Sequence, residues 1–221
     1  MKKMITCIAS ALLLTIGLHA QDPFYPTKEG ISLTYVEKSG KGKVNGYSQM
    51  SVTAVSVTDE NNFSITTASQ SMDEKKKELF SQPITMTVHI RNGVVQFDPT
   101  SMAGKLMEGM KITGDSFMLP ADASVGMALN DYNVTINMGA IKNTTSFTNV
   151  KVSGKETLNV GGKEIECLIV ENEASTKIMG IKQQSIQKTW FARNIGQVKM
   201  EMYNKKGKLM SAQELIEVTE P

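Results

Sequence analysis

Alternation of apolar and polar residues runs through most of this 221-residue chain, and it limits the possible folds more than any other feature. In ITMTVHIRN, which begins at Ile84, every second residue is apolar. The pattern recurs in ISLTYVEK from Ile31 and in QVKMEMY from Gln197. Successive side chains of a strand point to opposite faces of a sheet, so this period predicts strands with one buried face.

Turn signals separate these runs and predict antiparallel hairpins. Asn92–Gly93 and Gly161–Gly162 each stand between two strand-like segments, as is typical of tight two-residue turns. We count roughly ten to twelve strands by this criterion. They do not alternate with long helices, which argues against a doubly wound parallel sheet. A sandwich, a barrel and a single curved sheet all remain compatible with the pattern.

Residues 98–131 interrupt the period. Here apolar side chains recur at helical spacing, at Met102, Ala103, Leu106, Met107 and Met110. This spacing predicts one short amphipathic helix, with Asp98 or Thr100 as its cap. A second short helix is conceivable at residues 71–80, where Ser71 and Glu74 have capping-box spacing. The strands on both sides favour a hairpin tip there instead.

The first twenty residues have the layout of a secretory signal peptide. Lys2 and Lys3 precede an apolar run from Ile5 to Leu18, and Ala20 stands where cleavage is expected. The alternative, a membrane anchor, needs about 20 apolar residues, more than this run provides. We therefore expect residues 21–221 to form a single exported β domain, periplasmic or extracellular, without a transmembrane segment.

Charge and cysteine content argue against nucleic-acid binding and against thiol chemistry. Loss of residues 1–20 would leave 22 basic and 22 acidic residues, a balance that gives no electrostatic footprint for nucleic acid. Cys167 would be the only cysteine left, so no intramolecular disulfide can form. Its place between Ile165 and Ile169 favours a buried, inert thiol over a reactive one.

Catalytic constellations are largely missing from the sequence. His89 would be the sole histidine of the exported chain, and nucleophilic triads usually need a histidine base. Neither a metal-ligand spacing nor a glycine-rich phosphate loop is present, so we expect no cofactor and no enzymatic activity. Paired carboxylates from distant strands would escape such a search, which keeps an enzyme as a third hypothesis.

Methionine is the positive feature. Six methionines lie between Met102 and Met138, and this flexible side chain suits surfaces that accommodate varied apolar shapes. A curved sheet covered by the predicted helix would enclose either an apolar groove or a plain packed core. For the groove, the residues that we expect to bind a lipid or another apolar ligand are Met102, Leu106, Met107, Met110, Met118 and Trp190.

The C-terminal segment resembles a known family. Trp190–Phe191, Ile195–Lys199, Tyr203–Asn204, Gly207–Lys208 and Glu214–Leu215 follow the closing signature of TapB-like exported proteins of unknown function from Bacteroidetes. Residues 24–30, 119–131 and 154–172 fit the same family. A departure is Met127 and Asn130, in a loop where relatives often read Gly-Asp and Leu-Pro.

This resemblance implies a half-barrel similar to lipoprotein carriers (LolA-like), with a strongly bent antiparallel sheet around one or two short plugging helices. It carries over no catalytic residue, and lipid carriage would be an inference from fold likeness alone. Two functions follow as hypotheses. One is a periplasmic binding protein for a lipid or other apolar ligand, and the alternative is an envelope interaction or assembly protein with a filled core and a protein partner.

Overall fold

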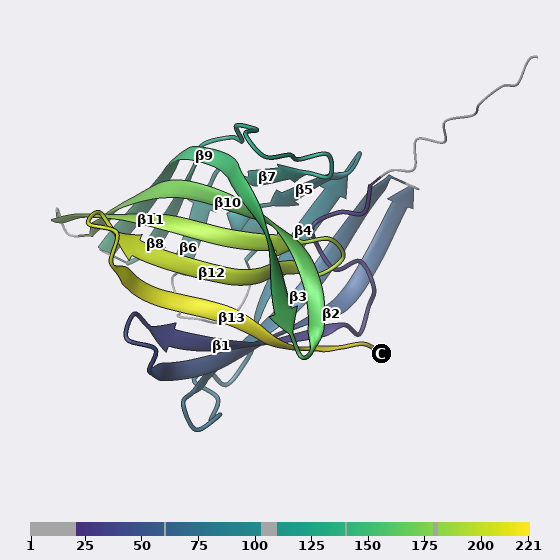
Figure 1. The fold of residues 1–221 in the computed structure, drawn as a ribbon, viewed down its shortest axis with the longest axis horizontal. Coiled ribbons are helices and arrows are strands. Elements are labelled where there is room, and N and C mark those ends of the chain that lie inside the picture. The colour runs from purple at the N-terminus through teal and green to yellow at the C-terminus, as the bar shows by residue number, and fades with distance from the viewer. Residues whose placement is uncertain (1–20, 60, 103–109, 140, 179–180) are drawn as a thin grey trace, which may run out of the picture.

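The computed structural model describes residues 21–59, 61–102, 110–139, 141–178 and 181–221. In this part of the chain, thirteen strands form one antiparallel sheet, and a 3-10 turn at Pro99–Ser101 is the only helical element. The predicted fold class, a strongly curved antiparallel half-barrel, is confirmed (Figure 1). The strands are β1 (Ser32–Ser39), β2 (Val44–Asp59), β3 (Asn62–Asp73), β4 (Ile84–Arg91), β5 (Val94–Phe97), β6 (Met110–Gly114), β7 (Phe117–Pro120), β8 (Tyr132–Met138), β9 (Ile141–Val160), β10 (Lys163–Ile178), β11 (Ile181–Ala192), β12 (Gly196–Asn204) and β13 (Leu209–Thr219).

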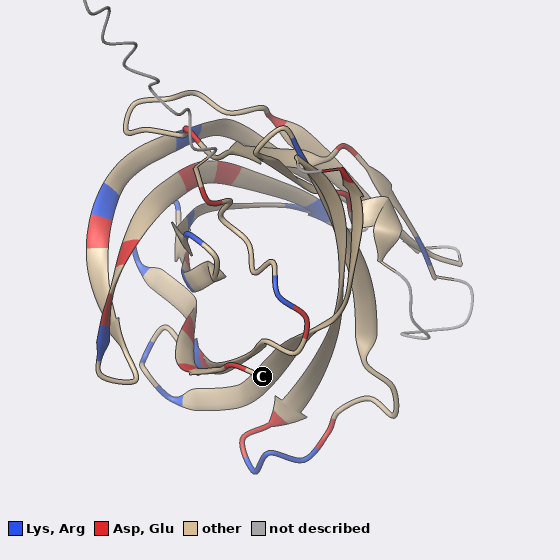
Figure 2. Cartoon of the chain, turned by 90° about the vertical axis from the view of Figure 1, so that its right-hand side faces the viewer, with Lys and Arg blue, Asp and Glu red and all other residues tan. Residues whose placement is uncertain are grey.

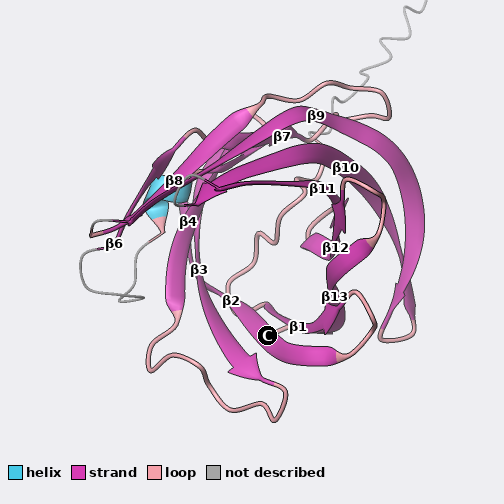
Figure 3. Ribbon diagram, turned by 90° about the vertical axis from the view of Figure 1, so that its left-hand side faces the viewer, coloured by secondary structure: helices cyan, strands magenta, loops and turns pink. Residues whose placement is uncertain are grey.

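The sheet curls until its two edges are joined by a very short link. The strand order is β6-β8-β9-β10-β11-β12-β13-β1-β2-β3-β4-β5-β7, so β6 and β7 stand at opposite ends. Yet only Asp115 and Ser116 separate these two strands in the chain. The end-on views therefore show the strands as a ring around an interior (Figures 2 and 3). Register shifts in several ladders, such as that between Trp190 and Phe191, mark bulges, which bend strands and add to the curl.

Asn130 closes the seam between the two edges. Its Nδ2 donates to the Ser116 carbonyl oxygen at 2.8 Å, and its Oδ1 accepts from the Met118 amide at 2.9 Å. Asp115 adds a second link, because its carboxylate accepts a hydrogen bond from the Asn133 amide at 3.1 Å. One side-chain amide thus satisfies backbone groups that an open sheet edge leaves unpaired. Asn130, one of the two residues at which this loop differs from the expected family pattern, therefore has a role in the fold.

The hairpins predicted from turn residues are confirmed. Asn92 and Gly93 have φ values of 50° and 77°, the positive angles that a type I′ turn requires. Gly161 and Gly162, at 58° and 86°, make the same kind of turn between the long strands β9 and β10. The hairpin interpretation of residues 71–80 also holds, since the Leu79 amide donates to the Ser71 carbonyl oxygen at 2.9 Å.

Only the two ends of the predicted Met-rich helix lie in the described residues, and neither end is α-helical. Residues 103–109, which include Leu106 and Met107, lie outside them. Before this stretch, Asp98 caps the 3-10 turn by accepting from the Thr100 amide at 2.8 Å. After it, Met110 begins β6 and pairs with Met138 of β8. Met110 therefore belongs to a strand and not to a helix, because backbone pairing with β8 holds it there.

An extended N-terminal segment, not a helix, plugs one part of the interior. Phe24 and Tyr25 are both 3% exposed, and Figure 2 shows this segment passing inside the ring of strands. Arg193 holds it: the guanidinium donates to the Asp22 carbonyl oxygen at 2.5 Å and to the Ala121 carbonyl oxygen at 2.8 Å, and lies over the Phe24 ring at 4.5 Å. The segment packs on fully buried side chains that include Leu33, Val52, Ile65, Val88, Ile90, Val95 and Leu119.

Within the described residues, no helix has the length and apolar character that crossing a bilayer requires.

Candidate functional site

A cavity of about 630 Å³ lies within the curled sheet. Inward-facing side chains from most of the strands line it, together with Tyr25 of the N-terminal segment. Its volume falls in the range of about 300–1,000 Å³ that small-molecule sites occupy. The packed core thus fills only part of the interior, and the cavity occupies the part beyond Tyr25.

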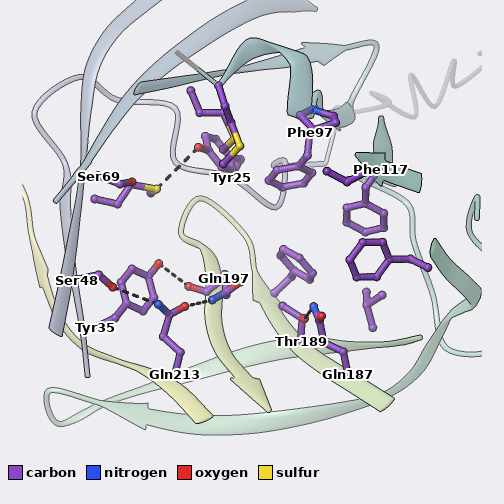
Figure 4. Close-up of a pocket in the computed structure, with 18 of the residues that line it drawn as sticks. Tyr25, Tyr35, Ser48, Ser69, Phe97, Phe117, Gln187, Thr189, Gln197 and Gln213 are labelled. Atoms are coloured by element: carbon purple, nitrogen blue, oxygen red, sulfur yellow. Dashed lines mark hydrogen bonds between the residues drawn. The ribbon is translucent and has the colours of Figure 1, made fainter. Parts of the chain in front are cut away.

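One side of the cavity is an aromatic wall, formed by Phe97, Phe117, Tyr132, Phe147 and Phe191. Ring centroids lie 5.6 Å apart for Phe97 and Phe117, and 5.4 Å apart for Phe117 and Tyr132. Tyr132 stacks on Phe147 at 4.4 Å, and Phe191 lies 6.1 Å from both Phe97 and Phe117. Mutual packing at these separations stabilises aromatic pairs. The cavity therefore has a firm apolar surface (Figure 4).

The other side is a polar wall, formed by Tyr35, Glu37, Ser48, Gln197 and Gln213. The Tyr35 hydroxyl donates to the Gln197 carbonyl oxygen at 2.8 Å, and the Gln197 Nε2 donates to the Gln213 Oε1 at 2.5 Å. The Gln213 Nε2 then donates to the Ser48 Oγ at 3.2 Å and to the Glu37 Oε1 at 3.4 Å. This chain of hydrogen bonds, drawn in part in Figure 4, fixes the orientation of both amides.

Three further polar side chains of β10 and β11 extend into the lining. The Gln187 Nε2 donates to the Thr189 Oγ1 at 3.1 Å. Asn172, directly across from Gln187 in the ladder, is only 4% exposed. Its Oδ1 has no hydrogen-bond partner in the part of the chain that the structure describes. A buried acceptor without a partner is destabilising, which singles out Asn172 as a candidate ligand contact.

Methionines and a tyrosine complete the apolar lining. Met50, Met86 and Met102 contribute side chains to the cavity, and the Tyr25 hydroxyl contacts the Met50 sulfur at 3.9 Å. Burial raises the pKa of Tyr25 to about 12. Burial likewise raises the pKa of Tyr35 and of Tyr132 well above the usual value for a phenol. All three hydroxyls are therefore neutral at physiological pH.

Charge is scarce in the lining and has one sign. Among the described residues that line the cavity, Glu37 and Asp115 are the only charged ones, and no lysine, arginine or histidine is present. Asp115 already accepts hydrogen bonds from the Asn133 amide and side chain. The arrangement suits an apolar or amphipathic molecule, and these residues offer no cation to pair with an anion.

Sequence comparison assigns most of the chain to one family. The DUF3108-like family model matches residues 28–215. The chain belongs to the DUF3108-like family. No curated protein matches this DUF3108-like chain.

Solved structures with the same fold are described as exported proteins or lipoproteins. A protein from Bacteroides fragilis, described as exported and of YmcC-like fold, has a TM-score of 0.76 at 19% identity, over 90% of this chain and 100% of its own. A protein from Parabacteroides distasonis, described as a lipoprotein, has a TM-score of 0.76 at 16% identity, over 90% of this chain and 99% of its own. At such identities the likeness establishes the fold and no more.

The residues that the sequence predicts to line a ligand groove do not lie together in this DUF3108-like fold. Met102 lines the cavity. Met118 is 38% exposed, because its neighbours Phe117 and Leu119 occupy the inward positions of β7. Met110 pairs with Met138 at the β6 edge and is not among the lining residues. Leu106 and Met107 lie outside the described residues.

Trp190 is buried on the opposite face of β11 from the cavity. The inward positions of this strand are Gln187, Thr189 and Phe191, so alternation turns Trp190 away from them. Its indole Nε1 donates to the Glu156 Oε2 at 2.7 Å, and the Lys199 ammonium lies 4.6 Å from the ring centroid. We therefore assign the only tryptophan a role in stabilising the sheet, in place of the predicted role in the ligand groove.

Sequence reasoning missed the aromatic wall. Its members come from β5, β7, β8, β9 and β11 and are scattered over residues 97–191, so no local motif joins them. The sequence signal for them is the alternation along each strand, because each of these aromatic residues occupies an inward position. Only the curl of the sheet, which brings β7 and β8 together at the seam, makes them neighbours.

The contacts of His89 and Cys167, the two residues considered for catalysis, favour structural roles for both. His89 Nδ1 lies 2.9 Å from the Ser64 Oγ, on the outward face of β3 and β4. Cys167 is 1% exposed, and burial, with a contribution from Glu156 and Glu166, raises the pKa of its thiol to about 12. Among the described residues, no group of three or more His, Cys, Asp or Glu side chains could hold a metal ion.

Proposed function

We propose that this protein is an exported, non-catalytic binding protein that holds a lipid or another apolar ligand in its interior cavity. The observation that carries the proposal is the aromatic and methionine lining of a cavity of about 630 Å³ inside the sheet. Ligand sites of this kind are concave and mostly apolar, with a few fixed polar groups. The aromatic wall supplies the apolar surface, and the polar wall supplies the fixed groups.

We also propose the finer family assignment and the compartment. The motifs at Trp190–Phe191, Ile195–Lys199 and Glu214–Leu215 support a place among TapB-like proteins within the DUF3108-like family. The signal-peptide layout of residues 1–20 supports action in the periplasm or outside the cell. The descriptions of the two structural relatives as exported or as a lipoprotein agree with this. The half-barrel likeness to lipoprotein carriers supports lipid as the ligand by analogy only.

A variant that fills the cavity tests the binding function. Ser69 lines the cavity from β3, so Ser69→Trp should occupy the space of a ligand. Ala68→Trp adds the same side chain on the opposite face of the same strand and serves as the matched control. We would titrate each purified protein with N-phenyl-1-naphthylamine, an uncharged apolar probe whose fluorescence rises in apolar surroundings.

The proposal predicts saturable probe binding by the native protein and by Ala68→Trp. Ser69→Trp should bind at least about tenfold more weakly, because a filled pocket excludes the probe while the fold remains intact. Circular dichroism would verify that both variants are folded. Equal probe binding by all three proteins would contradict the assignment of the cavity.

The alternative function, an envelope interaction protein, is favoured by one surface feature. Leu79 and Phe80, in the connection between β3 and β4, are 58% and 40% exposed. They follow three lysines, Lys75 to Lys77, in the same connection. Exposed apolar residues of this kind can contact a partner. Crosslinked capture of an envelope protein that is lost in a Leu79→Ser, Phe80→Ser variant, without any probe binding, would favour this alternative.

A further inference from the structure

The hydrogen-bonding character of the cavity points to a class of ligand. We propose that the cavity selects an amphiphile whose head group donates a hydrogen bond and carries no negative charge, such as a fatty alcohol or a long-chain amine. This inference rests on the proposed binding function and specifies the chemistry of its ligand.

The first observation is the free acceptor on Asn172. This side chain is 4% exposed, lines the cavity from β10, and its Oδ1 has no hydrogen-bond partner among the described residues. The Gln187 side chain, across from Asn172 in the ladder, donates to the Thr189 hydroxyl. A buried acceptor is satisfied most simply by a donor on the ligand.

The second observation is the direction of the hydrogen bonds in the polar wall. The Tyr35 hydroxyl donates to the main-chain carbonyl of Gln197, while the Gln197 side chain donates to Gln213 and Gln213 donates to the Glu37 carboxylate. Gln213 directs its Nε2 to both Ser48 and Glu37, so it keeps no free hydrogen there. The terminal bond to Glu37 is long, at 3.4 Å. The carboxylate therefore retains acceptor capacity that faces the cavity.

The third observation is the sign of the charge. The charged lining residues in the described part of the chain are Glu37 and Asp115, both acidic. A fatty-acid carboxylate or a phosphate head group placed there would be buried without a cation from the described lining residues and close to like charge, which is strongly unfavourable. An alcohol or ammonium head group instead meets acceptors, while its alkyl chain packs on the aromatic wall.

The test compares four ligands with a ten-carbon chain as competitors for N-phenyl-1-naphthylamine on the native protein at pH 8. Decan-1-ol and decylamine carry donors. 1-Methoxydecane has no donor, and decanoate is an anion. We expect the alcohol and the amine to displace the probe at concentrations at least about tenfold lower than the ether and the anion, since one unmatched buried hydrogen bond has an effect of this size.

Asn172→Leu and Asn143→Leu make a matched pair. Asn143 also has a buried Oδ1 without a partner, but it is not among the residues that line the cavity. We expect Asn172→Leu to lose most of the preference for decanol over the ether. Asn143→Leu should keep that preference. Glu37→Gln should weaken the binding of decylamine more than that of decanol, because it removes the charge and keeps an acceptor oxygen.

The outcomes distinguish the two levels of the proposal. No probe binding, and no displacement by any of the four ligands, would overturn the binding function itself. Displacement by the ether or by decanoate as effectively as by decanol would leave the binding function in place and overturn the selectivity inferred here. An unchanged preference in Asn172→Leu would likewise overturn the role of Asn172.

Discussion

The two halves of the interior are built from the same strands but are packed differently. In one half, inward positions carry aliphatic side chains that are fully buried, such as Leu33, Val52, Ile65 and Val88. A few positions further along these strands, the inward residues are polar or flexible and line the cavity: Tyr35 and Glu37 on β1, Ser48 and Met50 on β2, Ser69 and Ser71 on β3, and Met86 on β4. The change of residue type along each strand marks where the core ends.

The type of residue at the inward positions decides where the curled sheet forms a packed core and where it forms a cavity. Branched aliphatic side chains interdigitate at high density, and the N-terminal segment with Phe24 and Tyr25 seals this half. Serine, glutamine and methionine on the same inner face do not fill the remaining space, although the ring of strands continues around it. The site is thus a region in which the pattern of inward residues favours hydrogen bonding over dense packing.

Shortening one inward side chain in each half should give the largest difference in the free energy of unfolding. Ile65→Ala should lower the free energy of unfolding by about 2–5 kcal/mol, because it leaves a cavity in a dense core. Met86→Ala, on the neighbouring strand but facing the cavity, should cost about 1 kcal/mol, since fewer contacts are lost. Urea unfolding followed by circular dichroism measures both values. Equal losses would mean that the two halves are packed alike.

The boundary between the halves should be sensitive to alkaline pH. Burial raises the pKa of Tyr25 to about 12, above the unfolded value of about 10. Its contribution to stability is therefore fully present below pH 10 and is lost as the pH rises toward 12, by about 2–3 kcal/mol. Tyr25→Phe should flatten the fall of the urea midpoint over this range. Tyr47→Phe, on the outward face of β2, is the control and should leave the fall unchanged.

The seal on the packed half should loosen without Arg193. This side chain donates to the carbonyl oxygens of Asp22 and Ala121 and covers the Phe24 ring. Arg193→Ala should destabilise the protein by about 1–2 kcal/mol and speed amide hydrogen exchange at the start of the described chain. Arg91→Ala, at an exposed position of β4, should have neither effect. Unchanged exchange in Arg193→Ala would show that other contacts hold the segment.

The smallest effect should come from Asn172 in the cavity half. Replacing an unsatisfied buried amide by leucine removes an unfavourable group, so Asn172→Leu should leave stability unchanged or raise it by up to about 1 kcal/mol. Thermal unfolding of the protein without added ligand measures this. A loss of more than about 1 kcal/mol would mean that Asn172 stabilises the fold through contacts of its own.

Much of the fold could be predicted from sequence, because strands and hairpins depend on local patterns. The alternation around Ile84 and the turns at Asn92–Gly93 and Gly161–Gly162 specify strands and hairpins without knowledge of distant residues. The seam could not be predicted in this way. It depends on Asn130 reaching Ser116 and Met118, contacts that exist only once the sheet has curled.

The site was predictable only in part. Apolar spacing drew attention to methionines near residue 107, and of the predicted residues only Met102 is among the described residues that line the cavity. The aromatic wall depends on strands that are distant in sequence, and the polar wall on the pairing of β1 with both β13 and β2. In the sequence the aromatic residues are scattered. They become neighbours because all of them occupy inward positions of strands that the curled sheet brings together.

The central claim is that the less densely packed half of the interior holds a ligand, and native mass spectrometry tests it most directly. The full chain would be expressed with export to a bacterial periplasm and purified without detergent, and any bound molecule would be extracted and identified. The account predicts a stoichiometric adduct of an apolar or amphipathic small molecule that Ser69→Trp abolishes and Ala68→Trp retains. A mass without any adduct, together with no uptake of added decanol or decylamine, would contradict it.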